Sequence, residues 1–334
     1  MAIGALPETQ TALPPARGAN RGWLFGPAWD ALLIANIAWP VLVVAQLTDD
    51  FGGRAGVQFW QLYFVTTPHR WITLALVFFD RERLRSRPVA IPAVAGTVVA
   101  VCLGVHLTTG ALTCLLAVDY VWNAWHFAAQ HHGVYRIYQR WGEPQRLAGL
   151  AVEKWLLRSF VLYVVFRVAG TTWHLPELER ILHLADWWVL TIPLYLLAGD
   201  LVRTRGVASG QTLYLISVVA LYASLLGSAH YARPALLLSL ATASALFHAI
   251  EYLALVSWTV RDRRQSIGVR MGWLGQLVPH WLFAVGLFVV VLGAGGWLLE
   301  QRWMKLWLTH NVVAALLHYA YDGMIWRKSR TKVL

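Results

Sequence analysis

The chain has few charged residues and almost no cysteine for its length. Of its 334 residues, 13% are charged and two are cysteines. Cys102 and Cys114 both lie in apolar segments, which excludes a disulfide framework. The chain is also 58% hydrophobic and contains 19 tryptophans. This composition argues against an ordinary soluble protein of two domains.

Several recognisable motifs are absent as well. The sequence contains no G-x-S-x-G nucleophile motif, no Walker A loop and no G-x-G-x-x-G fingerprint. Residues 1–22 lack the hydrophobic run of a cleaved signal peptide and therefore predict a cytoplasmic tail. The net charge of +11 comes from short basic clusters between apolar runs. Such clusters orient membrane helices, so we do not expect a nucleic-acid partner.

The apolar runs that remain are long enough to cross a hydrocarbon core of about 30 Å. The sequence therefore predicts an all-α, polytopic transmembrane bundle. We place ten spans at about 28–46, 58–79, 89–106, 111–136, 150–169, 184–200, 210–228, 233–260, 273–297 and 303–326. The domain division is a cytoplasmic tail at 1–27, a single transmembrane domain at 28–326 and a basic cytoplasmic tail at 327–334.

Basic residues alternate between the two sets of loops. One set carries the arginine clusters at 81–87, 136–146, 203–205 and 261–270, together with both tails. The opposite set carries only Arg54, Arg180, Arg233, Arg302 and Lys305. The positive-inside rule then places both termini in the cytoplasm and the protein in the cell (inner) membrane.

With this orientation, histidines gather in the cytoplasmic half of the bilayer. Counting about 1.5 Å per residue from the inner ends of the spans gives their depth. Seven of the twelve histidines fall there, on five spans: His69, His126, His131, His132, His248, His280 and His318. Others, including His183 and His230, fall on or near the outer side.

Polar partners accompany these histidines at helical spacing. Asp322 follows His318 by four residues and Glu251 follows His248 by three, so each pair shares a helix face. Asp119, Asn123, His126 and Gln130 form a stripe along one face of span 4. Polar and ionisable groups at such depth face the bundle interior and usually mark function, and Arg70 belongs with them.

Each histidine also has a simpler interpretation. A single intramembrane histidine is often a hydrogen-bonding link between helices. His280 lies near the interface beside Pro279, and one of the adjacent His131 and His132 is close enough to the boundary to be solvated. Histidines from five helices at similar depth, two with a nearby carboxylate, are harder to explain as independent links. We therefore expect a metal site, with a haem site as the alternative.

The expected ligands are drawn from His69, His126, His131, His132, His248, Glu251, His280, His318 and Asp322. Imidazole with carboxylate suits iron, zinc, manganese or copper, and a 2-His-1-carboxylate set with open positions suits non-haem iron. Up to seven histidines and two acids are enough for two ions. Gln130 would orient ligands, Asp322 would bind metal or orient His318, and Arg70 would hold a substrate headgroup or a ligand carboxylate.

This architecture resembles the integral-membrane histidine-rich di-iron oxygenases, which include desaturases, hydroxylases and alkane monooxygenases. The nearest local match is His126-Phe-Ala-Ala-Gln-His131-His132, which looks like a histidine-box variant with one extra residue. Single histidines on separate helices are similar instead to membrane-embedded carotenoid-cleaving dioxygenases. The resemblance implies an iron-dependent oxidoreductase that uses O₂ to oxidise a lipid-like, hydrocarbon or isoprenoid substrate.

Partners follow from the same hypothesis. They are the lipid bilayer, a lipophilic substrate and, where electrons are needed, an acidic ferredoxin-like donor at the basic cytoplasmic face. Two other functions stay open: a haem-binding redox protein and a proton- or metal-coupled transporter. The histidine-bearing spans 2, 4, 8 and 10 do not divide into the clean inverted repeat that transporters tend to show.

Overall fold

The structure is a computed structural model that describes residues 22–48, 52–142, 150–171, 176–204, 209–265 and 273–326. Every regular element in these ranges is helical, which confirms the all-α prediction. Most of the two predicted tails and the basic loops near 146, 205 and 270 lie outside the described residues, so the structure does not place their charges.

The helices follow one another with short connections. They are α1 (Pro27–Trp29), η1 (Asp30–Ile34), α2 (Trp39–Leu47), α3 (Gly53–Trp60), η3 (Gln61–Thr66), α4 (Thr67–Phe79), α5 (Arg81–Ser86), α6 (Ala90–Thr109), α7 (Thr113–Gly142), α8 (Leu150–Gly170), α9 (Pro176–Thr204), α10 (Gly210–His230), α11 (Pro234–Gln265), α12 (Trp273–Leu277), η4 (Val278–His280) and α13 (Trp281–Ile325). Each of the ten predicted spans falls on one or more of these helices.

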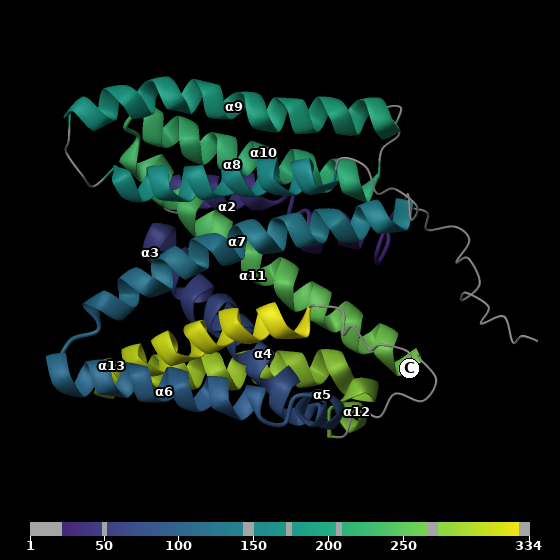
Figure 1. The fold of residues 1–334 in the computed structure, drawn as a ribbon, viewed down its shortest axis with the longest axis vertical. Helices are drawn as coiled ribbons and strands as arrows, with labels where there is room; N and C mark the ends of the chain where they lie inside the picture. The colour runs from purple at the N-terminus through teal and green to yellow at the C-terminus, as the bar shows by residue number, and fades with distance from the viewer. Residues whose placement is uncertain are drawn as a thin grey trace, which may run out of the picture.

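The helices form two packed groups that share α7 and α11 (Figure 1). In one group α8, α9 and α10 pack on one another, and α7 packs on α8. In the other group α13 packs against α4 and α6. α7 also contacts α13, and α11 contacts α10, α2 and α4. Residues of α7 and α11 therefore reach side chains from both groups.

The two groups have separate apolar cores. The larger core includes Phe160 of α8, Tyr222 of α10 and Phe247 of α11. Smaller cores join α13 to α6 and α4, through Cys102 and Tyr319 in one case and Val77 and Tyr321 in the other. The polar site described below lies where these apolar cores meet.

Five helices are long and apolar enough to cross a membrane, or six if the bent pair of Pro27–Ile34 and Trp39–Leu47 is one span. One of the five runs over Gly275–Ile325 and includes α13, whose 45 residues would be about 68 Å long if straight. Its backbone breaks at Trp303 (φ −139°, ψ 62°), and Figure 1 shows the two parts folded back beside each other. The number ten and the orientation of the termini stay predictions.

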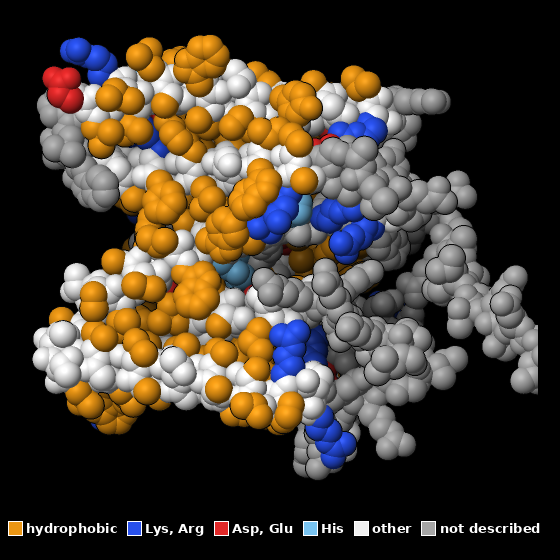
Figure 2. Space-filling view, viewed as in Figure 1, with side chains coloured by type: hydrophobic (Ala, Val, Ile, Leu, Met, Phe, Trp, Pro, Cys, Tyr) orange, Lys and Arg blue, Asp and Glu red, His pale blue; other side chains and the backbone are white. Residues whose placement is uncertain are grey.

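Large apolar side chains cover much of the outer surface. Figure 2 shows hydrophobic side chains spread over both groups of helices. Val202, Leu107 and Leu282 are each at least 80% exposed, and Trp188 is 74% exposed. An apolar exterior of this extent is typical of a surface that contacts lipid or another protein. Together with the long apolar helices, it supports a membrane protein.

Candidate metal centre

Four histidines from four different helices meet in the interior. They are His69 of α4, His126 of α7, His248 of α11 and His318 of α13, and all four are buried. The ring centroid of His318 lies 4.6 Å from that of His126 and 4.9 Å from that of His69. The ring of His248 lies 4.9 Å from His126 and 5.3 Å from His69. These four are among the seven histidines that depth along the spans placed at a similar level, but depth alone did not separate them from the other three.

Among the residues that the structure describes, His248 has no hydrogen-bond partner at either ring nitrogen. The ring is 1% exposed and stacks on Phe127 at 4.0 Å between centroids. A buried polar group without a partner costs roughly 1–3 kcal/mol, so such groups are rare in native proteins. A metal ion at the free nitrogen would remove that cost.

A chain of hydrogen bonds fixes the orientation of His318. Its Nδ1 lies 2.7 Å from Oγ1 of Thr73, which lies 2.6 Å from the hydroxyl of Tyr252. Tyr252 in turn donates to Oδ1 of Asp322 at 2.5 Å. If every donor in this chain points toward the carboxylate, Nδ1 of His318 carries the proton. Its Nε2 then presents a lone pair to the other histidines, as metal ligands do.

His69 is oriented by its own backbone. Its Nδ1 lies 2.5 Å from the carbonyl oxygen of Thr66, so Nδ1 is the donor and Nε2 is left with its lone pair. Thr66 is the last residue of the π-helical segment η3, which runs directly into α4. Single π-helical turns inside longer helices are frequent at functional sites, because the wider turn shifts side chains and carbonyl groups.

The contact between His126 and His318 has the length of a hydrogen bond and also fits metal coordination. Their Nε2 atoms are 3.0 Å apart. Two nitrogens bound at adjacent octahedral positions, each about 2.1 Å from one ion, lie about 3.0 Å apart. Oδ2 of Asp322 is 3.7 Å from Nε2 of His126 and 3.9 Å from Nε2 of His318. His69, His248 and His318, and likewise His126, His318 and Asp322, offer donor atoms within 4.8 Å of one another.

Glu251 belongs to a neighbouring network. Its carboxylate accepts hydrogen bonds from Gln130 at 3.1 Å and from Tyr214 of α10 at 3.0 Å. Gln130 also donates to the backbone carbonyl of His248 at 3.0 Å, which links this network to the four histidines. The carboxylate of Glu251 is therefore engaged by hydrogen-bond donors.

His131 joins the Glu251 network. It is fully buried, with Nδ1 2.8 Å from the hydroxyl of Tyr214 and Nε2 3.2 Å from that of Tyr222. Its Nδ1 also lies 3.4 Å from the Glu251 carboxylate. Both ring nitrogens therefore have protein partners, so the structure brings His131 close to the four histidines without leaving it a free donor atom.

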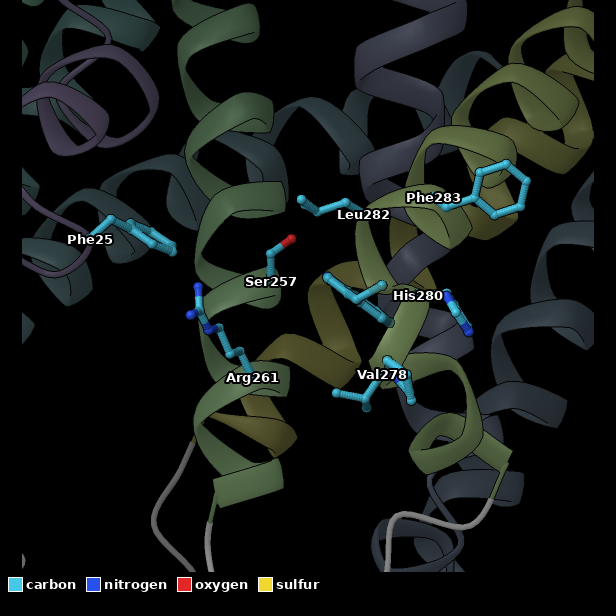
Figure 3. Close-up of a pocket in the computed structure, with 9 residues that line it drawn as sticks. Phe25, Ser257, Arg261, Val278, His280, Leu282 and Phe283 are labelled. Atoms are coloured by element: carbon cyan, nitrogen blue, oxygen red, sulfur yellow. The ribbon is translucent and has the colours of Figure 1, made fainter.

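His132 and His280 lie apart from the four histidines. α7 continues through Gly133, so the adjacent His131 and His132 point to different sides of the helix. His132 is half-buried near Lys154 and Arg158 of α8. His280 is exposed in η4, and Figure 3 shows its ring on the side of η4 away from α11. There it borders a cavity of about 360 Å³ with Ser257 and Arg261.

Arg70 lies at the edge of the four-histidine cluster. Its charge acts on His69, His126 and His318, and its side chain reaches the Tyr319 hydroxyl. Its Nε is buried and has no hydrogen-bond partner. Tyr319 also donates to Asp119 at 3.0 Å and Asn123 at 3.1 Å, so the polar stripe of α7 faces inward.

Sequence reasoning missed four residues of the site: Thr73, Tyr252, Tyr214 and Tyr222. Two of them were detectable, because Thr73 follows His69 by four residues and Tyr252 follows His248 by four. Gln130 and Asp322 stand in the same relation to His126 and His318. A hydrogen-bonding residue one turn after each histidine is therefore a signature of the whole site. Tyr214 and Tyr222 lie on a helix with no histidine at this depth, so nothing in the sequence pointed to them.

Comparison of the chain with family models, with curated protein sequences and with solved structures returned no match. The functional argument therefore depends on the geometry of the site.

Proposed function

We propose that this protein is a ten-span membrane oxidoreductase that holds non-haem iron and uses O₂ to oxidise a lipophilic substrate. One observation carries the proposal: four buried imidazoles from four helices converge, and one of them, His248, lacks any partner for either nitrogen. Independent helix-linking hydrogen bonds would leave each histidine with a partner, whereas a shared ion accounts for all four.

The residues divide into those that bind and those that orient. His69, His126, His248 and His318 would supply the nitrogen ligands, and iron bound there would supply the redox chemistry with O₂. Thr73, Tyr252 and Asp322 hold His318 in the required tautomer. Gln130 fixes the α11 backbone at His248 and ties it to Glu251. Oriented partners of this kind tune the affinity and basicity of metal-bound histidine.

The geometry favours one ion rather than the two suggested by the residue count. His131 and Glu251 are engaged by Tyr214, Tyr222 and Gln130. His132 and His280 lie elsewhere. The donor atoms that remain form two triads that share His318, and Asp322 belongs to one of them, so a single ion near His318 can draw ligands from both.

Haem fits this site poorly. Two axial histidines on one haem iron place their nitrogens about 4 Å apart, twice the metal–nitrogen distance, with a porphyrin plane between them. Here the Nε2 atoms of His126 and His318 are 3.0 Å apart, and two further rings stand within 5.3 Å. The packed imidazoles leave no slot for a macrocycle.

The surroundings favour a lipophilic substrate. The helices around the site carry exposed Val, Leu and Trp side chains on their outer faces, which suits a substrate dissolved in the bilayer. Arg70, with its unpartnered Nε, is the residue that would bind a polar end of that substrate. Where the reaction needs electrons, an acidic ferredoxin-like donor would bind at the basic cytoplasmic face.

Metal analysis and an optical spectrum of the same purified sample test the proposal. We expect about one iron per chain and no Soret band, and we expect His248→Ala to lose most of the iron. His280→Ala is the matched control, because it removes an exposed imidazole outside the cluster. Less than about one iron per chain after reconstitution, or equal iron in the two variants, would contradict the proposal. Substrate transport in liposomes by metal-free protein would instead support a carrier.

A further inference from the structure

A second cluster of histidines lies on α9 and α10, two helices that contribute no histidine to the four-histidine site. His183 and Asp186 are on α9, and His230 is the last residue of α10. The three residues offer donor atoms within 4.8 Å of one another. α9 and α10 belong to the group of helices opposite α4 and α13, and α9 begins at the left of Figure 1. None of these residues takes part in the proposed oxidoreductase site.

Each histidine has a carboxylate near the ring nitrogen that points away from the other histidine. Nδ1 of His230 lies 2.9 Å from Oδ2 of Asp186, a normal hydrogen bond. Nε2 of His183 lies 3.7 Å from the carboxylate of Glu179, one helical turn earlier. Asp186 is itself fixed, because Tyr163 donates to it at 2.7 Å and Arg167 pairs with it at 3.3 Å. The Asp186 carboxylate holds the proton of His230 on Nδ1, so Nε2 of His230 keeps its lone pair. The longer approach of Glu179 is an ion-pair contact and does not fix the proton of His183.

Two ring nitrogens face each other within this cluster. Nδ1 of His183 and Nε2 of His230 are 3.4 Å apart, and the two ring centroids are 4.3 Å apart. Nδ1 of His183 can donate a hydrogen bond across this distance, and the same two nitrogens can instead bind one cation. Two nitrogens bound tetrahedrally at about 2.05 Å from one zinc ion lie about 3.4 Å apart.

A cavity of about 340 Å³ lies beside the pair. It is lined by Leu182 and Ala229, which precede the two histidines in the chain, and by Glu179, Arg167 and Arg233. Water in this cavity would supply the further ligands that a tetrahedral ion needs. His183 is the more accessible ligand, with a side chain 37% exposed.

We propose that His183 and His230 form a second metal site, specific for a tetrahedral divalent cation and occupied by Zn²⁺, with Asp186 orienting His230. The proposal is independent of the oxidoreductase function. The alternative is a pair of histidines joined by a hydrogen bond and binding no metal.

Zinc titration of the full-length, iron-loaded protein, followed by dialysis and metal analysis, tests this site. We expect one zinc per chain in the unmodified protein and loss of that zinc in His183→Ala and in His230→Ala, with the iron content unchanged. His310→Ala is the matched control, because His310 is exposed and bonds only to the Leu306 carbonyl among its described contacts. Asp186→Asn should weaken zinc binding about 10–100-fold.

Each result decides the question. Zinc retained at one equivalent in His183→Ala, or no zinc bound by the unmodified protein, would overturn the proposal in favour of the hydrogen-bonded pair. His183 is partly exposed, so its removal leaves the fold intact even if the buried Asp186 variant does not fold. Zinc lost in His248→Ala but retained in His183→Ala would place the zinc in the four-histidine cluster and would likewise overturn the proposal.

Discussion

His131 and His132 show why two adjacent residues of the same type acquire different roles. A helix turns by about 100° per residue, so neighbours cannot share a face. His131 is turned toward the tyrosines of α10, and His132 toward the cations of α8. Position along a span predicts depth but not rotation about the helix axis. That is why the sequence placed both in the site and the structure places neither among the free donors.

Thr73 offers the sharpest test at the residue scale. Its hydroxyl links His318 to Tyr252, and valine has nearly the same shape without that hydroxyl. We expect Thr73→Val to lower iron affinity about 10–100-fold, because His318 loses the partner that fixes its tautomer. The measurement is iron retained against increasing concentrations of a chelator.

Thr73→Ser is the matched control, because it keeps the hydroxyl and removes a methyl group. Iron retention in this variant should stay close to that of the unmodified protein. If the valine and serine variants lost iron equally, packing rather than the hydrogen bond would be the cause. Equal retention in both variants would show that Thr73 does not position His318.

At the scale of the helices, the hydropathy of the sequence predicted where helices occur but not where their regular geometry is interrupted. Helices occupy most of each of the ten predicted ranges, yet α7 is not among the helices that are long and apolar enough to cross a membrane. Its inward face carries the polar stripe of Asp119 and Asn123. The π-helical turn at Gln61–Thr66 was also not predictable, because no proline or glycine occurs within it. Contacts made by neighbouring helices decide such features.

The contact between η3 and α13 depends on Gly293. A Cβ atom at this position would lie 2.5 Å from Cδ1 and 3.0 Å from Cγ of Phe64, so the whole ring would have to move. We expect Gly293→Ala to destabilise the protein by about 1–3 kcal/mol through overpacking. Because Phe64 lies in the segment that ends at Thr66, iron retention should also fall. Thermal unfolding and metal analysis measure the two effects.

Gly286→Ala is the control for the helix itself. Gly286 is in the same helix, and a Cβ atom there would have no neighbour within 4 Å. Alanine in an exposed helical position is favoured over glycine by up to about 1 kcal/mol, so this variant should be as stable as the unmodified protein or more stable. Equal stability of the two variants would show that the close approach to Phe64 is not needed.

For the whole molecule, the prediction concerns orientation in the membrane. The positive-inside rule applied to ten spans places both termini on the same, cytoplasmic side. Reporter fusions after residue 87 and at the C-terminus should therefore report a cytoplasmic location, and a fusion after Thr171 should report the opposite side. Termini on opposite sides would mean an odd number of spans, and the depths assigned to the histidines would no longer agree.

The positions of the four histidines in the sequence determine the order in which they are synthesised. Its first histidine is residue 69 and its last is residue 318, on the final helix of the chain. A membrane protein is inserted as it is translated, so the first three histidines are in the bilayer before the fourth has been made. Until the last helix packs against α4, no ribosome-bound intermediate has the full ligand set. If the proposed ion binds at this site, its loading follows synthesis of α13, and a bound ion marks a chain in which α13 has packed against α4.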